Sequence, residues 1–173
     1  MHVNEVKKNM NDFLNIEKET DSEFERIANE LLNNYAIQNH ESIYRMIEIE
    51  FYWNSPQHND DSTYKRKYVD PENGEWFFHY SGVDIGLKSE KFKGYGGILI
   101  RGIECTKTGD QYKGPMVCAM KLFSGTNAFS ESIKTRIIKY DFEKKTINKT
   151  PRVGLGNNAI ESKTHLLEYR FTI

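Results

Sequence analysis

The sequence has no long apolar run, two cysteines and four prolines in 173 residues. A membrane-spanning helix needs about 20 consecutive apolar residues, so we expect no membrane partner. The opening stretch MHVNEVKKNMNDF is too polar for a secretory signal, and we therefore expect a cytoplasmic location. Cys105 and Cys118 do not have the spacing of a metal site, which predicts buried free thiols, no metal and no cofactor.

The sequence also has little net charge, because its 24 Lys and Arg nearly balance its 25 Asp and Glu and leave a formal net charge of −1. The charges are nevertheless divided unevenly along the chain. Residues 1–87 hold 8 Lys and Arg against 17 Asp and Glu, whereas residues 88–173 hold 16 against 8. Such asymmetry indicates either a basic binding face in the second half or two halves whose charges mix on the folded surface.

Hydrophobic residues make up 38% of the chain and aromatic residues 13%, which is enough for one domain with a real core. Residues 1–20 form a polar arm in this interpretation, and residues 21–173 form the domain. The stretch SEFERIANELLNNY predicts a helix over residues 22–35, because its apolar residues recur at helical spacing. That stripe contains Phe24, Ile27, Leu31 and Leu32.

Strands are predicted around residues 43–53, 75–80 and 97–104, with a final strand near the end of the chain. A polar stretch of about twenty residues follows the first strand and indicates a functional or disordered loop. A short helix is expected after Pro115, while IKTRIIKYDF fits a helix or a strand. The mixture predicts an α+β fold, in which helices pack on a curved, mainly antiparallel β-sheet.

The first predicted strand contains IEIEFY, in which apolar residues alternate with Glu48, Glu50 and Tyr52. A strand places these three side chains on one face, about 6.6 Å apart from neighbour to neighbour. A carboxylate beside an aromatic ring is partly desolvated, which raises its pKa and suits it to accept a proton from water. The same alternation is typical of a strand with one solvated face.

Two other segments carry polar groups in apolar surroundings. Arg101 lies inside ILIRGIE, where a charge needs a partner, and Glu50 and Glu48 are the candidates for an ion pair that is catalytic or only structural. In EWFFHY, Phe78 and Tyr80 share one side of the strand. Aromatic side chains in this arrangement form a core or stack on a planar ligand.

Six segments occur in the order ANELLNNYAI, RMIEIEFY, QHND, GEWFFHYSG, GGILIRGIE and PRVGLG over about residues 24–172. In their order and spacing, these segments resemble the 3-methyladenine (alkyladenine) DNA glycosylase family. The resemblance implies a base-excision enzyme that hydrolyses the N-glycosidic bond of an alkylated or modified purine. Its partner would be double-stranded DNA with a damaged base, bound weakly and salt-dependently by a monomer.

The resemblance also implies roles for individual residues. Glu50 corresponds to the general base that activates water, and Arg101 to the arginine beside that water. The walls of the pocket for the flipped base correspond to Tyr52, His58 and Phe78. The residues expected to contact DNA are Tyr80, Lys65, Arg66, Lys67 and Arg152, of which the three in YKRKY fit an ordinary charged loop equally well.

The chain departs from the family at the aromatic residue that wedges into DNA, where Ser81 stands before Gly82 and Tyr80 lies one residue away. Cys105 replaces the proline that follows the arginine strand, and Lys88 replaces an asparagine. One alternative is therefore a non-catalytic protein that binds nucleic acid or another partner. A remoter alternative is a carbohydrate hydrolase that uses Glu48 and Glu50 as a carboxylate pair.

Overall fold

The computed structural model describes residues 10–130 and 132–173; the side chains of residues 64, 65 and 68 are outside the description. The helices are α1 (Asp21–Asn34), α2 (Pro115–Leu122) and α3 (Asn157–Glu161), with 3₁₀ helices η1 (Asp12–Leu14), η2 (Asp61–Tyr68) and η3 (Thr164–Leu166). The strands are β1 (Tyr35–Asn39), β2 (Ser42–Asn54), β3 (Trp76–His79), β4 (Gly82–Ser89), β5 (Gly94–Cys105), β6 (Gln111–Lys113), β7 (Arg136–Lys139), β8 (Asn148–Thr150) and β9 (Arg170–Thr172).

Within the described residues, nine strands form one curled sheet with the central order β3-β4-β5-β2-β1-β7. Strand β6 pairs with β5, and β9 pairs with both β2 and β8. All of these ladders are antiparallel. The predicted α+β fold with a curved antiparallel sheet is confirmed, and the segment that fitted a helix or a strand contains strand β7.

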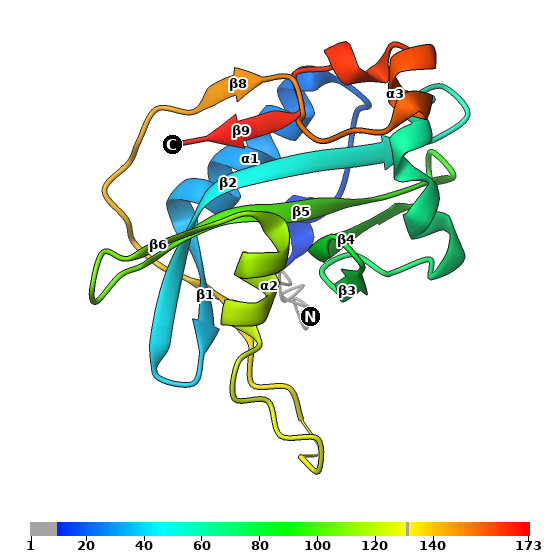
Figure 1. The fold of residues 1–173 in the computed structure, drawn as a ribbon. Coiled ribbons are helices and arrows are strands. Elements are labelled where there is room, and N and C mark those ends of the chain that lie inside the picture. Colours follow the sequence, from blue (N-terminus) through cyan, green and yellow to red (C-terminus); the bar gives the residue numbers. More distant parts are fainter. Residues whose placement is uncertain (1–9, 131) are drawn as a thin grey trace, which may run out of the picture.

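Helix α1 packs on the sheet through its apolar stripe, as predicted. Phe24, Ile27, Leu31 and Leu32 are completely buried, and the Phe24 ring lies 5.4 Å from the Phe51 ring of β2. Figure 1 shows α1 behind β2, whereas α2 lies in front of β5. The two cysteines are buried and free, which confirms the prediction of reduced thiols.

The chain enters the core earlier than expected. Leu14 and Ile16 are buried in the same hydrophobic cluster as α1, and the Phe13 ring stacks on Tyr35 at 4.5 Å. Residues 10–20 therefore pack with the domain instead of forming a separate arm, while residues 1–9 are outside the described residues. The polar segment after β2 contains η2 and is not structureless.

Strand β2 is buried on both faces along most of its length. Ile49 and Phe51 belong to the hydrophobic core, while η2 contacts the strand as well. The pairing of β2 with β5 shifts register between Met46 and Ile49, an irregularity that bends a strand and increases its twist. The face of β2 that the alternation predicts to be solvated is therefore mostly interior, and its polar side chains form the candidate site.

Candidate functional site

Glu50 is the most enclosed acidic side chain on this face of β2, with 0% of its surface exposed. Its Oε2 accepts a hydrogen bond from the Tyr52 hydroxyl at 2.8 Å, and its Oε1 accepts one from the Val153 backbone N–H at 2.9 Å. Burial raises the pKa of the Glu50 carboxyl, although the nearby Arg101 guanidinium and these hydrogen bonds oppose the rise. The group therefore has the desolvated character expected of a general base.

Arg101 joins Glu50 to Glu48. The distance from its Nε is 3.0 Å to Oε1 of Glu48 and 3.4 Å to Oε1 of Glu50. The Arg101 side chain is largely buried, with 17% of its surface exposed. Its closer partner is Glu48. The prediction of a carboxylate partner is thus met by both glutamates.

Glu48 differs from Glu50 in its surroundings. Arg170 of β9 donates from Nε to its Oε1 at 2.8 Å, in addition to the bond from Arg101. Burial acts to raise its pKa, but the hydrogen bonds from Arg170 and Arg101 outweigh burial and lower the pKa of Glu48. Since one guanidinium binds both carboxylates, Glu48 and Glu50 do not face each other across an open substrate site, as a carbohydrate hydrolase requires.

The Tyr52 ring is occupied by two guanidinium groups. The Cζ atoms of Arg66 and Arg152 lie 3.9 and 4.6 Å from its centroid, within the range of cation–π attraction. Burial, with the neighbouring Glu50 charge, raises the pKa of the Tyr52 hydroxyl far above its usual range, so this group is a neutral donor. The resemblance implies that a base stacks on Tyr52, but two arginine guanidinium groups already cover this ring.

Arg66 holds η2 against the sheet. Its Nε donates to Oδ2 of Asp84 on β4 at 2.6 Å, and both side chains are buried. Oδ1 of Asp84 binds Nε2 of His79 at 3.0 Å. Gly97 makes room for this pair, because a Cβ at that position would lie 2.5 Å from Oδ2 of Asp84.

Arg152 makes a second buried ion pair, with Asp60 at the start of η2. Its two terminal nitrogens lie 2.7 and 3.1 Å from the Asp60 oxygens, and they also donate to the backbone oxygens of Phe51 and Thr164. Its Nε is buried without a hydrogen-bond partner in the described structure. The arginine connects β2, η2 and η3.

These ion pairs change the expected DNA contacts. Arg66 and Arg152 are buried and bound to aspartates, so neither presents its charge to a phosphate in this structure. Lys67 is exposed on η2, whereas the side chain of Lys65 is outside the described residues. The YKRKY segment thus contains a structural arginine, a role that the run of cations does not indicate.

A cavity of about 500 Å³ opens beside this cluster. Tyr52, Leu99 and Arg101 line it from the sheet, and Ser62 and Arg66 line it from η2. Its remaining walls come from residues 79–81, Pro115 and residues 153–159. The residues that bind the Glu50 carboxylate, namely Tyr52, Arg101 and Val153, all line the cavity. The carboxylate therefore lies directly behind its wall.

Two predicted base-binding residues lie elsewhere. His58 packs beneath α1, where its Nε2 lies 2.7 Å from the Tyr169 hydroxyl and its Nδ1 lies 3.1 Å from the Trp53 backbone oxygen. Phe78 is 49% exposed and packs against the Phe123 ring at 4.6 Å. Neither residue lines the cavity, so the structure does not bring them together with Glu50 and Arg101.

His79 takes the place expected for Phe78. Besides its contact with Asp84, its Nδ1 accepts a hydrogen bond from the Ser81 backbone N–H at 3.2 Å. The donor at Ser81 makes Nδ1 the unprotonated nitrogen in the neutral ring, and Nε2 then donates to Asp84. Both nitrogens are used, so the ring surface is what His79 offers to a molecule in the cavity.

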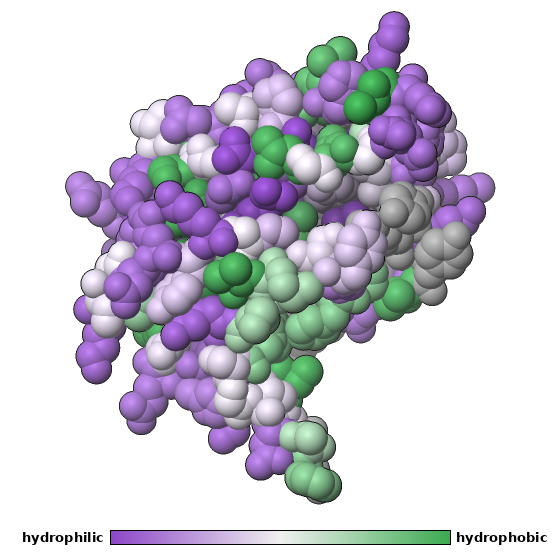
Figure 2. Space-filling view, in the orientation of Figure 1, coloured by the Kyte–Doolittle hydropathy of each residue, from purple (hydrophilic) through white to green (hydrophobic). Residues whose placement is uncertain are grey.

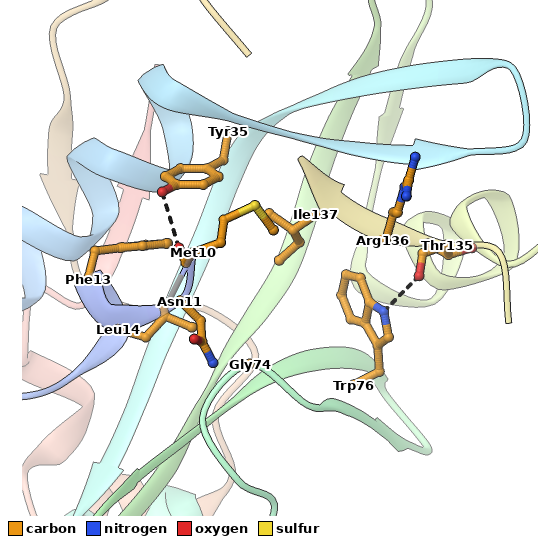
Figure 3. Close-up of a pocket in the computed structure, with 10 residues that line it drawn as sticks. All are labelled: Met10, Asn11, Phe13, Leu14, Tyr35, Gly74, Trp76, Thr135, Arg136 and Ile137. Carbon is orange, nitrogen blue, oxygen red and sulfur yellow. Dashed lines mark hydrogen bonds between the residues drawn. The ribbon is translucent and has the colours of Figure 1, made fainter. Parts of the chain in front are cut away.

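A second, apolar cavity of about 330 Å³ is lined by residues from η1, β1, β3 and β7 and the segments beside them. Figure 3 shows Met10, Phe13 and Trp76 among the side chains that surround it. The Trp76 indole donates to the Thr135 oxygen at 3.1 Å, and the Tyr35 hydroxyl donates to the Met10 oxygen at 3.2 Å. This cavity has no carboxylate, histidine or cysteine among its lining residues, so it lacks the acid–base groups of the first cavity.

The part of the chain that the structure describes contains no group of three or more His, Cys, Asp or Glu side chains arranged to hold a metal ion. In residues 10–130 and 132–173, every helix is too short or too polar to cross a membrane.

Comparison with known proteins gives one similar viral protein. The chain is 26% identical over 190 residues to "Uncharacterized protein L759" of Acanthamoeba polyphaga mimivirus, and the match covers 87% of this chain and 85% of that protein. No protein-family model matches the chain, and no solved structure matches it.

Proposed function

We propose that the protein hydrolyses the N-glycosidic bond of a modified purine in nucleic acid, with Glu50 as the general base. One observation carries the proposal. A buried carboxylate with a raised pKa lies behind a cavity wall, and its three contacts line that cavity. The residues implied by the resemblance to alkyladenine DNA glycosylases include Glu50, Arg101 and Tyr52 of this cluster.

In this reaction, water enters from the cavity and approaches Glu50 between Arg101 and Val153. The carboxylate accepts a proton from the water as oxygen attacks the sugar carbon, and the purine leaves. The negative charge of Glu50 also stabilises the positive charge that develops on the sugar. Arg101 favours the ionised carboxylate, because its guanidinium lies 3.4 Å from Oε1.

The purine would rest against His79 and Leu99, two of the residues that line the cavity. The surface of an imidazole ring provides a stacking partner for a planar base. The Arg66 guanidinium covers the Tyr52 ring and also lines the cavity, so its plane offers a further stacking surface. Pocket specificity in this proposal therefore depends on His79 and Arg66 instead of His58 and Phe78.

A second candidate is a protein that binds a modified base without cleaving it. The complete burial of Glu50 favours this function, because both carboxylate oxygens already accept hydrogen bonds from protein groups. In that case the carboxylate only supports the cavity. Release of the free base distinguishes the two functions.

The test is base release from alkylated DNA by the wild-type protein and by Glu50→Gln. The enzyme hypothesis expects free base from the wild type and a large loss of rate in the variant. Binding of the same DNA without release by the wild-type protein would support the non-catalytic function. Circular dichroism of both proteins establishes that the comparison is made on folded material.

A further inference from the structure

The candidate site carries an exposed aromatic side chain beside α2. Tyr80 lines the cavity and is 75% exposed. The turn that bears it packs closely on α2, because a Cβ at Gly82 would lie 2.8 Å from the Pro115 oxygen. Met116 and Val117 follow Pro115 and are exposed. Figure 2 shows the apolar side chains that gather over α2.

The cations of the described cavity wall are already paired. Arg66 and Arg101 line the cavity, but each is ion-paired with a carboxylate. The affinity of proteins for duplex DNA comes largely from Lys and Arg that neutralise phosphates. Both of the Lys and Arg side chains that line the described part of the cavity are thus engaged by carboxylates.

Exposed aromatic rings are suited to binding single-stranded nucleic acid. In a single strand the bases are accessible, and they stack on aromatic side chains with little dependence on sequence. A duplex must first unstack and extrude the target nucleotide, at a cost in free energy that a single strand avoids. Tyr80 stands at the cavity mouth, where the nucleotide next to a bound base would pass.

We infer that the substrate is a single-stranded nucleic acid, whose target purine enters the cavity while the neighbouring base stacks on Tyr80. This inference rests on the proposed function and specifies its substrate. The chemistry of stacking is common to DNA and RNA strands, so both belong to the class. The apolar side chains of α2 extend the contact beyond Tyr80.

The test is fluorescence anisotropy with labelled oligoadenylate of about 12 nucleotides, a length within the range of single-strand sites. The probes are the DNA strand, the RNA strand and the DNA duplex with oligothymidylate. At least one single strand should bind about 10-fold or more tighter than the duplex. Tyr80→Ala should weaken that binding about 5- to 100-fold, since stacking contributes this much per base.

Tyr80→Phe keeps the ring and should bind like the wild type. Phe129→Ala is the matched control, because Phe129 is 97% exposed on the loop after α2 that extends away from the domain in Figure 1. Equal affinity for duplex and single strands, or equal effects of Tyr80→Ala and Phe129→Ala, would overturn the inference.

Base release is measured on single-stranded and on duplex alkylated DNA. The results can then contradict the proposed activity and the proposed substrate independently of each other. Binding of single strands with no base release removes the enzyme function and leaves the single-strand surface in place. Release from the duplex alone removes the single-strand substrate and leaves the enzyme function in place.

Discussion

Arg66 and Asp84 form a buried ion pair, with 2.6 Å between Nε and Oδ2, that attaches η2 to β4 beside the candidate site. The same guanidinium covers the Tyr52 ring at 3.9 Å, and the same carboxylate orients His79. The pair thus shapes two walls of the cavity. Arg66 belongs to a run of cations that is typical of a charged surface loop. In the structure it is instead a buried residue of the interior.

Arg66→Ala should destabilise the protein strongly. Removing one partner of a buried ion pair leaves the other charge uncompensated, which costs roughly 3–5 kcal/mol. Urea unfolding should show a lower midpoint for this variant. Lys67→Ala is the matched control on the same helix, and its exposed side chain predicts a change within about 0.5 kcal/mol. Equal midpoints for the two variants would contradict the role given to Arg66.

Gly97→Ala should also destabilise the protein, because the added Cβ would lie 2.5 Å from Asp84 Oδ2 and 3.0 Å from Arg66 Nε. Both groups are buried and have little freedom to move. Gly156→Ala is the control, since its Cβ meets no atom within 4 Å and its φ of −79° suits any residue. Thermal unfolding should show a clearly lower Tm for the first variant and a much smaller change for the second, which alters only the N-cap position of the short helix α3.

The raised pKa of Glu50 makes a prediction about stability and pH. Because its pKa is higher in the folded protein than in the unfolded chain, Glu50 contributes stability that is fully present below the unfolded pKa. That contribution is lost as pH rises from about 4.5 through the folded pKa. Glu50→Gln lacks this titration, so its free energy of unfolding should improve relative to wild type between pH 4 and pH 8.

Urea unfolding of both proteins at several pH values measures this difference. Other carboxylates, including Glu48 with its lowered pKa, titrate in both proteins and cancel in the comparison. A difference that stays constant across the range would contradict a raised pKa for Glu50.

The sequence predicted the elements whose pattern is local. The apolar stripe of α1 and the alternation of β2 were sufficient, because each follows one period. Strand β4 was not predicted, since it is buried on both faces and therefore does not alternate. Its two glycines, Gly82 and Gly86, also disfavour a strand assignment. Strand β1 follows α1 directly and reads as the end of the helix.

The sequence predicted the part of the site that comes from strands β2 and β5. Glu50, Tyr52 and Arg101 come together because β2 and β5 pair side by side. The choice between Phe78 and His79 depended on Asp84 of β4, a strand that the sequence did not predict. Similarly, the position of His58 is fixed by Tyr169, 111 residues away, and spacing along the chain contains no sign of that contact.

Glu48 and Glu50 can be separated by activity. Alternation along β2 places both on one face, but their environments differ: burial raises the pKa of Glu50, while Arg170 and Arg101 hold the pKa of Glu48 low despite burial. A carboxylate with a low pKa and two guanidinium partners is a weak base. Only Glu50 also contacts Tyr52 and Val153 of the cavity wall.

Glu50→Gln should therefore lower the rate of base release by about 10²- to 10⁴-fold, the usual contribution of a general base. Glu48→Gln preserves size and polarity, and it should change the rate far less, because it acts only by letting Arg101 shift. Single-turnover release of base, measured at saturating protein, excludes effects on binding from the comparison. Equal losses in the two variants, or a loss confined to Glu48→Gln, would show that Glu50 is not the base.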